Sequence, residues 1–87
     1  MTARLDILYF AWVRERIGLD AEVIDHPGEA VRVRDLVAML AKRGAGYAEA
    51  FAEPARLRAA LDQKFVSLDA EIGHAREVAI FPPVTGG

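Results

Sequence analysis

The stretch from Val33 to Ala41, VRDLVAMLA, carries the clearest structural signal in the chain. Its apolar residues recur every three or four positions, which places them on one stripe of an amphipathic helix. These residues are Val33, Leu36, Val37, Leu40 and Ala41. Lys42-Arg43-Gly44 then supplies the basic residues and the glycine that typically end a helix. We therefore predict one main helix whose apolar stripe packs against a sheet.

Alternating patterns on both sides of this helix predict the strands of that sheet. Leu5, Ile7 and Tyr9 alternate with their neighbours at the period of a half-buried strand. Further strands are expected at 22–24, 57–61, 64–67 and 77–81, the last with Val78 and Ile80 facing the core. A helical turn is expected around 13–17, and a short helix or ordered loop within 45–54, pinned by Tyr47 and Phe51. The order β-β-α-β-β-β indicates an α+β roll.

Composition excludes several classes of function. With 87 residues the chain forms one domain, which buries about 60–65% of its unfolded surface. A net charge of −2 argues against nucleic-acid binding, which needs a clustered basic surface. No run approaches the length of a membrane helix, and Met1-Thr2-Ala3-Arg4 leads into a strand pattern without a signal-peptide core. We expect a cytoplasmic protein with neither nucleic-acid nor membrane partners.

Side chains that could support catalysis are sparse. The chain has no cysteine, which excludes disulfides, thiolate metal sites and a cysteine nucleophile. His26 and His74 stand in predicted turns without an acid at metal-ligand spacing, so no metal site is expected. Ser67 lacks the glycine elbow of a hydrolase, and Asp69 and Glu71 are expected to be solvated in a loop. We predict that the chain is not catalytic by itself and binds no cofactor.

The most informative segment is the end of the chain, Phe81-Pro82-Pro83-Val84-Thr85-Gly86-Gly87. Two successive prolines stop a strand and favour an extended conformation. Residues 82–87 could then reach about 20 Å. Gly86 and Gly87 have no side chains, so they could thread a channel too narrow for other residues. We predict a folded domain over 1–81 and an extended tail over 82–87, whose working group is the terminal carboxylate of Gly87.

A Gly-Gly end could also be a frayed terminus or a cloning scar. Chance would produce it in only about 0.5% of chains at average glycine usage, and a frayed end would not need two prolines after an apolar strand. The functional interpretation is therefore favoured. An inert carboxylate is usually activated as an acyl-adenylate made from ATP, and a sulfur donor can then convert it into a nucleophilic thiocarboxylate.

Two blocks of the chain resemble the family of molybdopterin synthase small subunits, the sulfur carriers of molybdenum-cofactor biosynthesis. The first is residues 8–18, LYFAWVRERIG, where Trp12 is bulkier than expected for the family. The second is Val66-Ser67 followed by residues 77–87, EVAIFPPVTGG, and this last run is highly specific. The middle, from His26 to Pro54, matches only in length and helix placement.

The resemblance implies a β-grasp fold, as in ubiquitin, with a mixed sheet covered by one main helix. It implies that an ATP-dependent adenylating enzyme activates Gly87, which becomes a thiocarboxylate. Within a heterotetrameric synthase, this form would enter the large subunit and donate sulfur to cyclic pyranopterin monophosphate. Two such transfers would build the dithiolene of molybdopterin. The residues that would thread into the partner are Pro82, Pro83, Val84, Thr85 and Gly86.

Strand parity predicts an apolar patch outside the core. The residues expected to face the helix are Ile7, Val66 and Ile80. Phe10, Phe65 and Phe81 should then point to the opposite face. Three exposed aromatic residues beside the tail would form a contiguous patch of the kind that marks a partner interface. The alternative is that the segment 45–54 covers them.

Other functions remain open at this point. The chain could supply sulfur for thiamine synthesis or tRNA thiolation, or it could be conjugated to proteins as a ubiquitin-like modifier through Gly87. Those families share the Gly-Gly end but match Phe-Pro-Pro-Val-Thr poorly. A β-grasp binding module without chemistry is a further possibility, and a dispensable C-terminus would reveal it.

Overall fold

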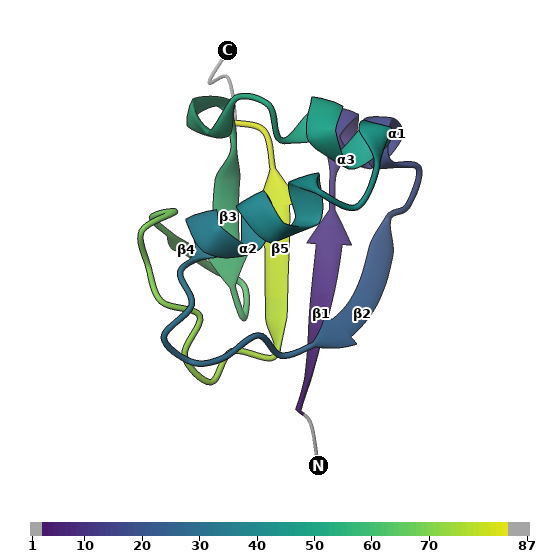
Figure 1. Ribbon diagram of the computed structural model, residues 1–87. Coiled ribbons are helices and arrows are strands. Elements are labelled where there is room, and N and C mark those ends of the chain that lie inside the picture. The colour runs from purple at the N-terminus through teal and green to yellow at the C-terminus, as the bar shows by residue number, and fades with distance from the viewer. Residues whose placement is uncertain (1–2, 84–87) are drawn as a thin grey trace.

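The computed structural model describes residues 3–83, which form a five-stranded sheet with the helix over residues 33–41 lying across one of its faces (Figure 1). The strands are β1 (Arg4–Tyr9), β2 (Ala21–Asp25), β3 (Arg58–Leu61), β4 (Lys64–Val66) and β5 (Glu77–Phe81). The helices are α1 (Ala11–Ile17), α2 (Val33–Ala41), α3 (Ala45–Ala50) and the 3-10 turn η1 (Pro54–Arg56). The predicted tail residues Val84, Thr85, Gly86 and Gly87 lie outside the described residues.

The elements agree with the sequence patterns, and α2 has the bounds of the predicted main helix. The predicted turn near residue 13 is the longer helix α1, which ends at Gly18 in a left-handed conformation with φ of 88°. The weak pattern between 45 and 54 corresponds to α3. There Phe51 is buried and Tyr47 packs against the core, as predicted.

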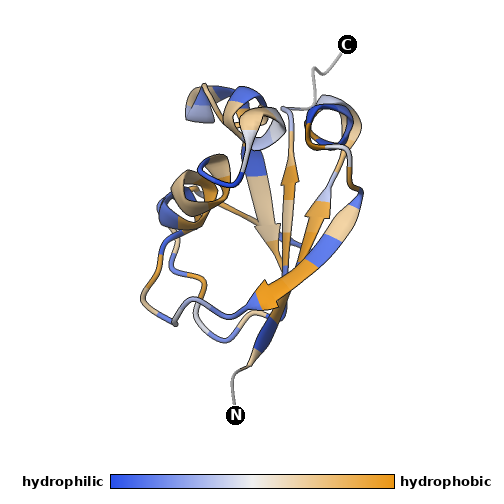
Figure 2. Ribbon diagram, turned by 45° about the vertical axis from the view of Figure 1, so that its right-hand side comes forward, coloured by the Kyte–Doolittle hydropathy of each residue, from blue (hydrophilic) through white to orange (hydrophobic). Residues whose placement is uncertain are grey.

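The sheet has the strand order β2-β1-β5-β3-β4. The central pair, β1 and β5, is parallel, whereas the β1–β2, β3–β5 and β3–β4 pairs are antiparallel. A parallel pair needs a crossover connection, and the segment carrying α2 and α3 provides it on one side of the sheet (Figures 1 and 2). This mixed sheet with a crossing helix is the predicted β-grasp fold.

The core lies between α2 and the near face of the sheet. The apolar stripe of α2 is buried at Val33, Leu36, Val37 and Leu40. From the sheet, β1 contributes Leu5, Ile7 and Tyr9, and β5 contributes Val78 and Ile80, each at most 1% exposed. Figure 2 shows the strands carrying long apolar stretches, in orange, while polar and apolar residues alternate along the helices. The predicted facing of these strands is confirmed.

One carboxylate ties the edge strand β2 to the rest of the fold. Glu22 Oε2 accepts hydrogen bonds from the hydroxyls of Tyr9 (2.7 Å) and Tyr47 (2.8 Å). Its Oε1 accepts one from Arg43 at 3.0 Å. Burial, together with the Glu22 hydrogen bond and charge, raises the pKa of both tyrosine hydroxyls. The Glu22 network therefore joins β1, β2 and α3 through two phenol hydroxyls that donate to one shared carboxylate oxygen.

Candidate functional site

A shallow apolar groove of about 480 Å³ crosses the sheet face that α2 leaves uncovered. Its lining residues are Phe10, Ala11, Ala60, Gln63, Phe65, Ala79, Phe81, Pro82 and Pro83. The groove lies on the outer face because Ala79 and Phe81 alternate along β5 with the core residues Val78 and Ile80. Apart from Gln63, every lining side chain is apolar.

Two alanines form the floor of this groove. Ala60 of β3 pairs with Ala79 of β5 on one side and with Phe65 of β4 on the other. Their side chains are small, so the neighbouring aromatic rings stand above them as walls. The rings of Phe65 and Phe81 are 5.6 Å apart with an interplanar angle of 43°. Strand parity would have found the alanines, but a search for aromatic residues alone passes over them.

Phe10 reaches the groove by a different route. β1 ends at Tyr9, so strand parity does not extend to Phe10, which is the N-cap residue of α1. Its backbone N–H still donates to the Ile80 carbonyl at 3.3 Å. The next residue, Ala11, has φ of 54°, and the chain turns there into α1. The predicted place of Phe10 is therefore right, although a tight turn, not the strand period, positions it.

The groove is open along its length. Phe65 is 81% exposed and Phe10 47% exposed. The segment 45–54, which could have covered these rings, packs elsewhere: α3 contacts α1 and α2, and Tyr47 bonds to Glu22. Within residues 3–83, an apolar surface therefore faces solvent, as surfaces that bind partner proteins commonly do.

The groove ends where the predicted tail begins. Phe81 is the last residue of β5, and Pro82 and Pro83 both line the groove. Whatever occupies the groove would therefore touch the first residues of the tail. Val84 to Gly87, including the predicted reactive Gly87, lie beyond the described residues. The structure thus locates the root of the tail and one adjoining surface.

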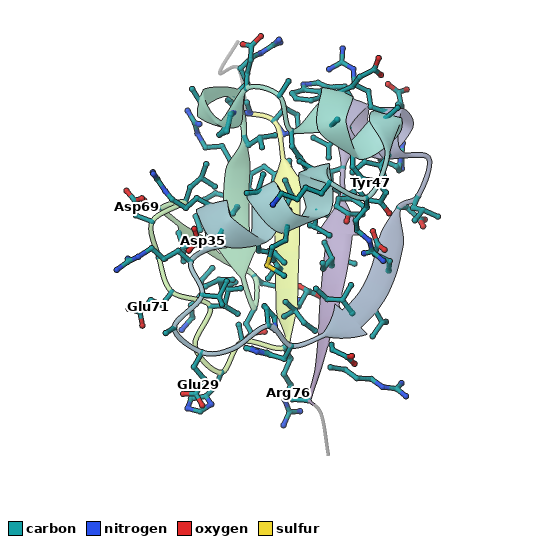
Figure 3. All side chains as sticks on the ribbon, viewed as in Figure 1. Glu29, Asp35, Tyr47, Asp69, Glu71 and Arg76 are labelled. Carbon is teal, nitrogen blue, oxygen red and sulfur yellow. The ribbon has the colours of Figure 1, made fainter. Side chains whose placement is uncertain are left out.

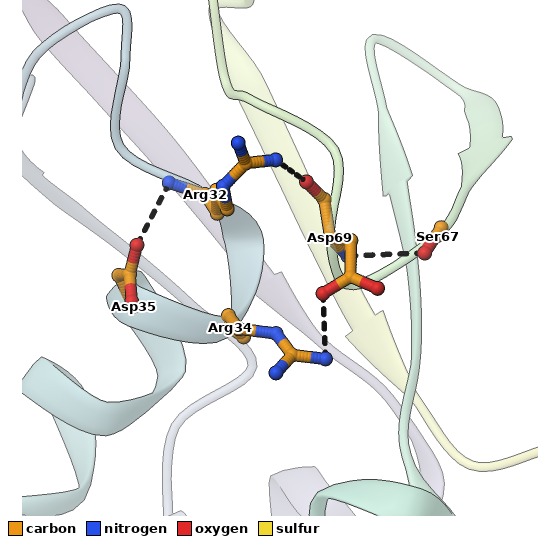
Figure 4. A network of polar contacts seen from close by, with 5 residues as sticks. All are labelled: Arg32, Arg34, Asp35, Ser67 and Asp69. Carbon is orange, nitrogen blue, oxygen red and sulfur yellow. Dashed lines mark hydrogen bonds and ion pairs between the residues drawn. The ribbon is translucent and has the colours of Figure 1, made fainter.

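Ser67, Asp69 and Glu71 form polar contacts that hold a loop in place. Asp69 forms an ion pair with Arg34 at 2.6 Å, and its backbone carbonyl accepts from the Arg32 guanidinium (Figure 4). Ser67 Oγ accepts the Asp69 backbone N–H at 3.0 Å. Glu71 lies 3.9 Å from Arg32. These contacts fasten the loop after β4 to the start of α2, and the two carboxylates stay largely exposed.

A hollow of about 750 Å³ lies at the other end of the molecule. Its lining residues include His26, His74, Glu29 and Arg76, and Glu29 and Arg76 are labelled near the bottom of Figure 3. His74 Nε2 is 3.2 Å from Glu29 Oε1, and His26 Nδ1 accepts the Gly28 N–H at 3.1 Å. No group of three or more His, Cys, Asp or Glu side chains within residues 3–83 could hold a metal ion. The side chains that line this hollow include both acidic and basic groups, so the hollow does not indicate a particular class of ligand.

Comparison with known proteins identifies the family. Residues 7–87 match the ThiS family, and the matched range contains every groove residue and the tail. The chain belongs to the ThiS family. Among the described residues of this ThiS-family chain, no helix combines the length and the apolar character needed to cross a membrane.

Two curated relatives of this ThiS-family chain carry the same name. It is 39% identical over 84 residues to the molybdopterin synthase sulfur carrier subunit of Haemophilus influenzae, with 95% of this chain and 99% of the relative covered. It is 41% identical over 86 residues to the subunit of that name from Escherichia coli, with the same coverage. The resemblance seen in the two sequence blocks is thereby confirmed.

A solved structure supports the fold. A proposed molybdopterin converting factor, subunit 1, from Pyrococcus furiosus superposes with a TM-score of 0.71 at 34% identity. The match covers 95% of this ThiS-family chain and all of the other. The β-grasp architecture therefore extends over nearly the whole chain.

Proposed function

We propose that this protein is the sulfur-carrier subunit of a molybdopterin synthase and carries sulfur as a thiocarboxylate on Gly87. The observation that carries the proposal is the near-complete match to two curated subunits of that name, at about 40% identity over 95% of the chain. The Phe-Pro-Pro-Val-Thr run before Gly-Gly, which the thiamine and modifier families match poorly although they share Gly-Gly, supports the same pathway.

The chemistry proceeds on the main chain. The Gly87 carboxylate attacks the α-phosphorus of ATP in an adenylating enzyme, which releases pyrophosphate and leaves a glycyl adenylate. A sulfur donor then displaces AMP, so the C–O bond to phosphate breaks and a C–S bond forms. The resulting thiocarboxylate is a sulfur nucleophile that attacks cyclic pyranopterin monophosphate in the large subunit and forms a thioester to it. Water then hydrolyses the acyl–sulfur bond, which leaves the sulfur on the pterin and returns Gly87 to a carboxylate. None of these steps needs a side chain of this protein or a bound cofactor.

Docking and delivery are one event in this proposal. The large subunit seats on the groove between Phe10, Phe65 and Phe81, which adjoins the root of the tail. The tail from Pro82 to Gly87 then extends into the partner, up to about 20 Å away. The two prolines at the start of the tail would restrict its conformations, so the tail would lose less conformational entropy on binding.

The first test follows the sulfur atom. Incubation with the adenylating enzyme, ATP and a sulfur donor should raise the intact mass by one oxygen-to-sulfur exchange that maps to the C-terminal peptide. Sulfur on an internal peptide would contradict the carrier chemistry. A variant without Gly87 is the matched control and should gain no sulfur.

The second test separates pathways. The thiocarboxylated protein is mixed with a molybdopterin synthase large subunit and pterin precursor, or with a thiazole synthase of thiamine synthesis, and each product is assayed. Dithiolene without thiazole is the expected result. The reverse result would keep the carrier chemistry and move the protein to the thiamine pathway. Covalent attachment to other proteins would instead indicate a modifier.

A further inference from the structure

Three non-glycine residues in the described part of the chain have a left-handed backbone: Ala11 (φ 54°), Asp62 (φ 48°) and Gln63 (φ 71°). This conformation is unfavourable for residues that carry a Cβ, and such residues gather at functional sites. Two of the three, Ala11 and Gln63, line the groove. The strained positions thus coincide with the candidate docking surface.

Gln63 lies in a turn where glycine would be preferred. Asp62 and Gln63 are the two residues between the paired Leu61 and Lys64, and both have positive φ. Such a two-residue hairpin is a type I′ turn, which favours Asn or Asp followed by glycine. Asp62 fits this pattern and accepts hydrogen bonds from the backbone N–H groups of Arg76 (3.0 Å) and Glu77 (3.1 Å).

Gln63 has no comparable local role. Within residues 3–83 its side chain makes no hydrogen bond, and the residue is exposed. Its carboxamide is the one polar group among the described side chains that line the groove. Because strained backbone positions cluster at binding sites, a strained residue whose side chain makes no internal hydrogen bond points to a contact outside the fold.

Other left-handed positions of the chain do use glycine. Gly18 has φ of 88° and Gly73 has φ of 59°, and at neither would a Cβ meet any atom within 4 Å. Space is therefore available at both, and glycine stands there for its backbone conformation. Ala11 and Gln63 have the same left-handed backbone conformation but carry a side chain, and both line the groove.

We propose that Ala11 and Gln63 are specificity-determining residues of the groove, retained because their side chains contact the docked partner. The proposal rests on the proposed function and names the large synthase subunit as the occupant. Ala11 extends the apolar wall beside Phe10, and Gln63 offers a donor and an acceptor at the rim beside Phe65. The matching partner surface is an apolar ridge with a hydrogen-bonding group at its edge.

The test compares stability with affinity. Gln63→Gly should keep or raise the thermal unfolding midpoint, because it relieves the left-handed strain, yet weaken binding to a molybdopterin synthase large subunit about fivefold to tenfold, the factor of one net hydrogen bond. Ala11→Gly should behave in the same way with a smaller loss of affinity. Gln63→Asn should recover part of the affinity, since Asn tolerates this backbone and keeps the carboxamide.

The outcomes distinguish a failure of docking at the groove from a failure of the roles proposed for Ala11 and Gln63. Calorimetry gives the dissociation constant of each complex, with Phe65→Arg as the reference for disrupted docking. If Phe65→Arg binds like the wild type, the proposed docking fails. If Phe65→Arg weakens binding but both glycine variants bind like the wild type, only this inference is overturned. A lower unfolding midpoint in both glycine variants would also overturn it, because the side chains would then serve the fold.

Discussion

Truncation of Phe65 to alanine tests the docking surface most directly. A phenylalanine buries about 200 Å² when it is fully enclosed, and Phe65 is 81% exposed. About 160 Å² of its surface is therefore still available to a partner, worth up to about 4 kcal/mol at about 25 cal/mol per Å². The remaining roughly 40 Å² corresponds to about 1 kcal/mol of folding stability by the same conversion.

We expect Phe65→Ala to weaken binding of the large subunit by about 2–4 kcal/mol, or about 30-fold to 1,000-fold. Isothermal titration calorimetry measures the affinity, and thermal unfolding measures the smaller loss of stability. Val23→Ala is the matched control, since Val23 is 55% exposed on the same sheet face but outside the groove. Equal losses of affinity in both variants, or an unchanged affinity for Phe65→Ala, would refute the assignment of the groove.

Three further predictions concern the tail and the Glu22 network. Gly86→Val should abolish sulfur transfer without changing thermal unfolding, because a β-branched side chain cannot pass a glycine-sized channel; a wild-type transfer rate would contradict this. Glu22→Gln should lower stability by about 1–3 kcal/mol, since it weakens three hydrogen bonds to one partly buried carboxylate. By contrast, Glu71→Gln, in an exposed pair with 3.9 Å separation, should cost no more than about 1 kcal/mol. The raised pKa values of Tyr9 and Tyr47 mean that the folded state holds these protons more tightly than the unfolded chain. Stability to urea should therefore be full below about pH 10 and fall above it, mainly through Tyr9, by up to about 1.4 kcal/mol per pH unit; an equally steep fall in Tyr9→Phe would show that Tyr9 is not responsible.

Much of the fold could be predicted because its signals are local. The stripe from Val33 to Ala41 predicted α2, and the alternation around Ile7 predicted β1 and its buried face. Local patterns were weakest at 45–54, where α3 is short and depends on contacts with α1 and α2. Helices of this length have little stability of their own, so tertiary packing decides whether they form.

The candidate site was only partly predictable. Strand parity placed Phe65 and Phe81 on the outer face, because a side-chain period of two persists along a strand. Phe10 depends on a turn at Ala11, and nothing local in the sequence requires an alanine to adopt a left-handed backbone. Gln63 was not recognised at all, since its importance appears only when the β3–β4 hairpin brings it beside the groove.

The sequence by itself determined most of the elements and predicted the chemistry of the tail, since period, proline placement and the Gly-Gly end act within a few residues. Only the tertiary structure decided which of these elements and side chains are neighbours in space. The parallel pairing of β1 with β5 joins segments about 70 residues apart in the numbering and sets the groove next to Pro82. The Glu22 network likewise gathers Tyr9, Arg43 and Tyr47 from separate segments. Such contacts depend on how the chain closes on itself, and no local pattern encodes that closure.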